Sequence, residues 1–69
     1  MYSVYWNREC WYNNFMTEDE AINEVARLIK DNDGEYVAAG TDNGVHWWMV
    51  KFANEYGAIY YEAITVKKN

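Results

Sequence analysis

Only one stretch of this chain has the spacing of an amphipathic helix, and that stretch is short. Thr17 and Glu20 form a capping box, in which each side chain can bond the backbone amide of the other residue. The apolar positions that follow have helical spacing: Ile22, Val25, Ala26 and Ile29. Gly34 comes directly after a polar run and is expected to end the helix in a left-handed conformation. We therefore expect one helix over residues 17–31.

The remaining chain has the alternation and turn signals of β-structure. Residues 2–6 alternate between the two faces of a half-buried strand. Residues 35–41, 45–53 and 58–67 are β-prone runs, separated by Asn43-Gly44 and by a second turn that ends at Gly57. The sequence predicts an α+β fold of order β-α-β-β-β. In this fold a single helix packs on one face of a small, mainly antiparallel, four-stranded sheet.

Length and composition limit what such a fold can be. A chain of 69 residues is expected to form one domain, residues 1–69. Thirteen aromatic residues have to supply much of its core. One cysteine excludes an internal disulfide and a cysteine-based zinc site. The first residues resemble neither a signal peptide nor a membrane span, so we expect a soluble, cytoplasmic protein without membrane contact.

The two turns predict the register of the last three strands and hence the two faces of the sheet. The first turn pairs Ala39 with Trp48 and Val37 with Val50, and the second pairs Phe52 with Tyr60. The expected core face carries Val37, Ala39, Trp48, Val50, Phe52, Tyr60, Ile64 and Val66. The opposite face carries Tyr36, Ala38, Val45, Trp47, Met49, Lys51, Tyr61, Ala63, Thr65 and Lys67.

A single short helix cannot cover both faces, so the second face needs an explanation. One explanation is that residues 7–15, with their aromatic side chains, fold over it as a lid. The alternatives are a homodimer through this face and a binding site for another macromolecule. Trp, Tyr and Met are enriched at the centres of protein interfaces, which favours an interaction surface.

Catalytic chemistry and bound metals are not predicted. Cys10 and His46 are the only thiol and imidazole, and no orienting acid or oxyanion loop accompanies them. His46 is instead expected as a polar cap at one end of the core face. The acids of residues 18–20 point in diverging directions on a helix, and residues 31–35 lack the frame of a calcium loop. We expect a protein that is not an enzyme and has no cofactor.

The charge points to a basic protein as the partner. Eleven acids against six bases give a net charge of −5, which makes nucleic-acid binding on the aromatic face an unfavoured alternative. Acids concentrate on and around the helix, where they can steer a basic partner. The expected binding residues are aromatic or apolar anchors and steering acids: Tyr36, Trp47, Met49 and Tyr61, with Glu18, Asp19, Glu24, Asp31 and Asp33.

In size, charge and architecture the chain resembles small phage or mobile-element accessory proteins, such as anti-CRISPR and anti-restriction inhibitors. No residue motif carries this resemblance, so it assigns no functional residues. It implies an inhibitor that blocks a basic nucleic-acid-binding protein in the host cytoplasm. The alternative is a bacterial housekeeping domain that buries its aromatic face in a homodimer.

Overall fold

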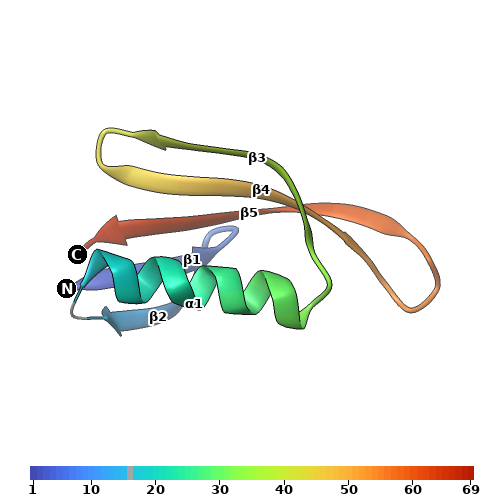
Figure 1. The fold of residues 1–69 in the computed structure, drawn as a ribbon, viewed down its shortest axis with the longest axis horizontal. Coiled ribbons are helices and arrows are strands. Elements are labelled where there is room, and N and C mark those ends of the chain that lie inside the picture. Colours follow the sequence, from blue (N-terminus) through green and yellow to red (C-terminus); the bar gives the residue numbers. More distant parts are fainter. Residues whose placement is uncertain (16) are drawn as a thin grey trace.

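A computed structural model describes residues 1–15 and 17–69 and has one helix and one antiparallel sheet (Figure 1). The elements are β1 (Tyr2–Trp6), β2 (Glu9–Phe15), α1 (Glu18–Asp31), β3 (Glu35–Asp42), β4 (Val45–Ala53) and β5 (Ile59–Lys68). The strand order is β2-β1-β5-β4-β3. The α+β class and the single helix are confirmed. The predicted four strands are corrected to five.

The helix begins with the predicted capping box, but a residue other than the predicted Gly34 supplies the left-handed conformation at its end. Thr17 is the N-cap, and both halves of the capping box with Glu20 are present. At the other end, Asp33 takes the left-handed conformation (φ 53°), and its amide bonds the carbonyl of Lys30. Gly34 follows and donates to the carbonyl of Ile29, which completes a Schellman motif. The prediction that Gly34 supplies the left-handed residue is therefore wrong.

The fifth strand is β2, which falls in the stretch that one of the three explanations above treated as a lid. Asn7 adopts a positive φ of 58° and turns the chain back, so that Glu9 pairs with Trp6 and Tyr12 pairs with Val4. Trp11 stacks on Trp6, and Tyr12 packs against the hydrophobic core on the helix side. The lid interpretation is wrong, because residues 9–15 extend the sheet instead of covering it.

The predicted register holds for most of the three C-terminal strands. Ala39 pairs with Trp48, and Trp48 pairs with Ile64. Asn43 and Gly44 both have positive φ, as a two-residue hairpin turn requires. Near the start of β3 a bulge shifts the register, so Tyr36 and not Val37 lies opposite Val50. The face assignment of Tyr36 and the pairing of Val37 with Val50 are therefore wrong, and Val37 is 53% exposed and outside the core.

The core lies between α1 and one face of the sheet. Its buried members are Val4, Ala21, Val25, Leu28, Ile29, Val50, Phe52, Ile64 and Val66. The helix contacts β1, β5 and β2. Fourteen helical residues span about 21 Å, so the β4–β5 hairpin extends past the end of the helix (Figure 1). Among residues 1–15 and 17–69, no helix is both long and apolar enough to cross a membrane.

Candidate interaction surface

The face of the sheet opposite α1 carries a row of aromatic, apolar and basic side chains, which we call the open face. Alternation along each strand and the observed pairings place its members. They include Tyr5, Ala38, Gly40, Val45, Trp47, Met49, Lys51, Tyr61, Ala63, Thr65 and Lys67. Of the predicted anchors, the structure brings Trp47, Met49 and Tyr61 together on this face.

Trp47 is held in place by Gly40, its partner on the neighbouring strand. A β-carbon on Gly40 would lie only 2.8 Å from Cζ2 of the Trp47 indole. The ring therefore lies directly over the backbone of β3 and depends on the missing side chain. This arrangement fixes a large aromatic surface close to the edge of the sheet without making it part of the core.

Two lysines add positive charge to the open face. The Nζ atom of Lys67 lies 4.5 Å from the centre of the Tyr5 ring, within cation–π range. Lys51 pairs with Tyr61 across β4 and β5, and its Nζ atom is 3.8 Å from a carboxylate oxygen of Glu35. Tyr61 has 59% of its surface exposed. The face therefore combines exposed aromatic area with charges at its border.

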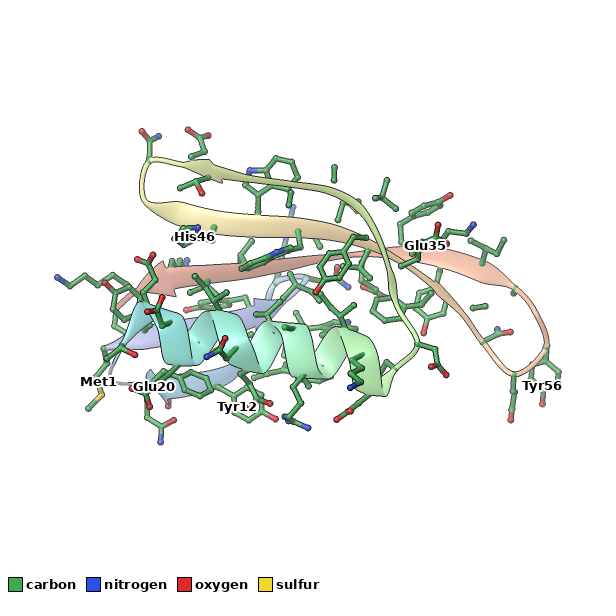
Figure 2. All side chains as sticks on the ribbon, viewed as in Figure 1. Met1, Tyr12, Glu20, Glu35, His46 and Tyr56 are labelled. Atoms are coloured by element: carbon green, nitrogen blue, oxygen red, sulfur yellow. The ribbon has the colours of Figure 1, made fainter. Side chains whose placement is uncertain are left out.

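Further exposed apolar side chains gather on the overhanging end of the β4–β5 hairpin. Tyr56 is at the tip, 87% exposed, and is far from the helix (Figure 2). Ile59 and Tyr60 follow it on β5 and are also exposed. Tyr36 is 54% exposed, but the bulge places it in register with Val50, on the helix side. Tyr36 is therefore not in the row of Trp47 and Met49.

The predicted steering acids lie on and just after α1, across the sheet from the open face. Three of them have partners: Glu18 bonds His46 at 2.7 Å, and Glu24 and Asp31 both bond Arg27. The hydrogen bond with Glu24 raises the pKa of Arg27 above its ordinary value. The structure thus separates the aromatic anchors from the helical acids. They form two surfaces on opposite sides of the sheet.

Sequence reasoning missed two acids that border the open face. Glu35 pairs with Lys51, and Asp42 pairs with Val45, so these pairings place both carboxylates on the open-face side of β3. The sequence interpretation also missed two residues that hold side chains of the open face. Tyr5 lies under the ammonium group of Lys67, and Gly40 leaves room for the Trp47 indole. The Asn43-Gly44 turn and the alternation beside it were the signals that could have identified Asp42, whereas Glu35 lies beyond the bulge and its place on the open-face side does not follow from alternation.

Cys10 and His46 are kept apart by the fold. Cys10 pairs with Tyr5 on the open-face side of β2, whereas His46 is on β4 and bonds Thr41 and Glu18 on the helix side. The polar-cap prediction for His46 agrees with these contacts. In the part of the chain that the structure describes, there is no cavity and no group of His, Cys, Asp and Glu that could hold a metal ion.

Comparison of the chain with protein-family models, with curated protein sequences and with solved structures finds no match.

Proposed function

We propose that the protein is a non-catalytic binding module whose open face docks on a basic protein and blocks that partner's nucleic-acid contact. The observation that carries the proposal is the Trp47 indole fixed over Gly40 on a sheet face that α1 does not cover. Aromatic rings held in one position lose little entropy on binding and are frequent hot spots. The net charge of −5 favours a basic partner over nucleic acid.

Small size and acidity make a host nuclease the first class of partner to test. A panel of purified basic nucleases can be measured for binding to the immobilised protein. Each captured nuclease is then challenged with its nucleic-acid substrate. The proposal expects binding and substrate to be mutually exclusive. A captured nuclease that still binds its substrate with unchanged affinity would contradict the inhibitory role.

Replacing Trp47 with alanine is expected to weaken binding to such a partner by at least about 30-fold, roughly 2 kcal/mol, mostly through faster dissociation. The reason is the loss of the largest fixed ring on the open face. Association and dissociation rates can be measured by surface plasmon resonance. Tyr56→Ser is the matched control, since it removes an exposed aromatic ring at the hairpin tip. Equal losses in both variants would mean that the open face is not the main contact.

Neutralising the acids at the end of the helix is expected to act on the association rate. The double variant Asp31→Asn with Asp33→Asn should slow association by about two- to threefold at low salt, with the effect fading at high salt. The effect is small because these acids lie across the sheet from Trp47. Asp42→Asn, on the open-face side, should slow association more. If the helix variant abolishes binding and Trp47→Ala is silent, the acidic helix is the interface and the protein acts as a decoy.

Light scattering distinguishes the partner-binding proposal from a homodimer. At micromolar concentration a free monomer has a mass of 8.2 kDa, and a dimer would have about 16 kDa. A dimer that Trp47→Ala dissociates would assign the open face to self-association and contradict the proposal.

A further inference from the structure

The sheet has two edge strands, and only β3 keeps an unbroken register over most of its length. At β2 the register shifts twice along its pairing with β1, and the Asn13 carbonyl accepts a bond from the Asn69 side chain. At β3 the pairing with β4 is continuous from Ala38 to Asp42. Bulges and added contacts are devices that stop an edge from pairing further. The β3 edge lacks them over these five residues.

The turn between β3 and β4 determines which backbone groups of β3 point outward. In a two-residue hairpin the residues that flank the loop, here Asp42 and Val45, exchange both hydrogen bonds. Hydrogen-bonded pairs then alternate, so Gly40 and Ala38 also bond β4. Ala39 and Thr41 therefore direct their N–H and C=O groups away from the sheet. These groups form the free side of a ladder that another strand could continue.

The side chains along this edge do not shield it. The stretch from residue 38 to residue 41 is Ala-Ala-Gly-Thr, with no lysine or proline to obstruct a new strand. β3 is exposed along nearly its whole length. An added strand would lie beside the Trp47 indole, because that ring extends over Gly40 toward the edge.

The charges at the ends of β3 favour a basic added strand over a second copy of this chain. The segment is flanked by Glu35 and Asp42, both on the open-face side, so an antiparallel second copy would bring the Asp42 end of one strand to the Glu35 end of the other. It would also join two chains of net charge −5. A strand with lysine or arginine on its open-face side meets Asp42 instead, and an arginine opposite Gly40 can stack on Trp47.

We propose that an extended, arginine- or lysine-containing segment of a partner protein adds to β3 as a sixth strand, bonding the outward groups of Ala39 and Thr41. This inference rests on the proposed function, since it names how a basic partner is held beside the open face. Backbone bonds supply affinity in such strand addition, and alternate side chains supply selectivity.

The probe is a synthetic nine-residue peptide that alternates arginine and valine, compared with one that alternates glutamate and valine. Amide hydrogen exchange of the full chain is followed by NMR with and without each peptide. The arginine peptide is expected to slow exchange at Ala39 and Thr41 by at least about 10-fold, with little change at Ala38 and Gly40, which already bond β4. The glutamate peptide is expected to have no effect.

Ala39→Pro removes one outward N–H and leaves the ladder to β4 intact, and proline is tolerated at such edge positions. It should weaken binding of the arginine peptide by at least about 10-fold, whereas Ala39→Val, which keeps the N–H, should stay within about twofold. Two results with the arginine peptide would overturn strand addition: unchanged affinity in Ala39→Pro, or unchanged amide exchange at Ala39 and Thr41.

Amide exchange at these residues that slows as the concentration of the protein alone is raised would also overturn it, because that result indicates pairing between two copies of the chain. If a nuclease still binds Ala39→Pro but not Trp47→Ala, the proposed function stands without the added strand.

Discussion

Replacing Phe52 with alanine is expected to lower the free energy of unfolding by about 3–5 kcal/mol, enough to unfold much of the population at 25 °C. Phe52 is only 2% exposed, and its ring centre lies 5.3 Å from that of Trp6 and 5.7 Å from that of Tyr60. A chain of 69 residues buries a small core and has little stability to lose. Urea unfolding followed by circular dichroism measures the loss.

Two further variants show whether the loss comes from the core. Phe52→Leu keeps most of the buried apolar volume and should cost clearly less than alanine. Ile59→Ala removes an exposed side chain on β5 and should change stability by less than about 0.5 kcal/mol. A Phe52→Ala variant as stable as Ile59→Ala would contradict the burial of Phe52 in the core.

Gly34→Ala is expected to be the second large effect, with a loss of about 1–3 kcal/mol in the free energy of unfolding. A β-carbon at this position would lie 2.7 Å from both Phe52 Cε1 and Val50 Cγ1, and 2.9 Å from Ile29 Cγ2. All three neighbours are buried, so the added methyl group has to displace the core between the helix end and β4. Thermal and urea unfolding both report this change.

Gly57→Asn is the matched control for that clash. Gly57 has a φ of 81° and nothing within 4 Å of an added β-carbon, and asparagine tolerates the left-handed region. This variant should cost well under 1 kcal/mol. If Gly34→Ala proves as mild as Gly57→Asn, the close approach of the helix end to the sheet is looser than described.

The parts of the fold that could be predicted are those with a local chemical signal. The capping box at Thr17 located the helix, and the Asn43-Gly44 turn located a hairpin and its register. β2 lacked such signals, because Asn13 and Asn14 have low β-propensity and the turn before it contains no glycine. Asn7 supplies the positive φ there instead. Pairing with β1 stabilises β2, and that contact cannot be seen in its own residues.

The bulge in β3 was not predictable from β3 alone. Gly34 packs against Val50 and Phe52, which fixes where β3 begins, and the Asn43-Gly44 turn fixes where it ends. The eight residues of β3 then lie opposite the seven residues from Val45 to Lys51. One residue has to be left unpaired, and this excess moved Tyr36 off the open face. The candidate site was therefore predictable on β4, on β5 and on β3 from Ala38 onward, where the register holds, and not at the start of β3.

The contact between Trp47 and Gly40 also restricts the order in which this protein can change over evolution. Any side chain larger than hydrogen at position 40 collides with the indole, so such a mutation is expected to displace the ring while Trp47 is present. Loss of the tryptophan removes that barrier, and a β-branched residue at position 40 then favours the strand and leaves no room for the ring to return. Once both residues are lost, restoring the aromatic face therefore requires two mutations in a fixed order. Glycine has to return at position 40 before tryptophan can return at position 47.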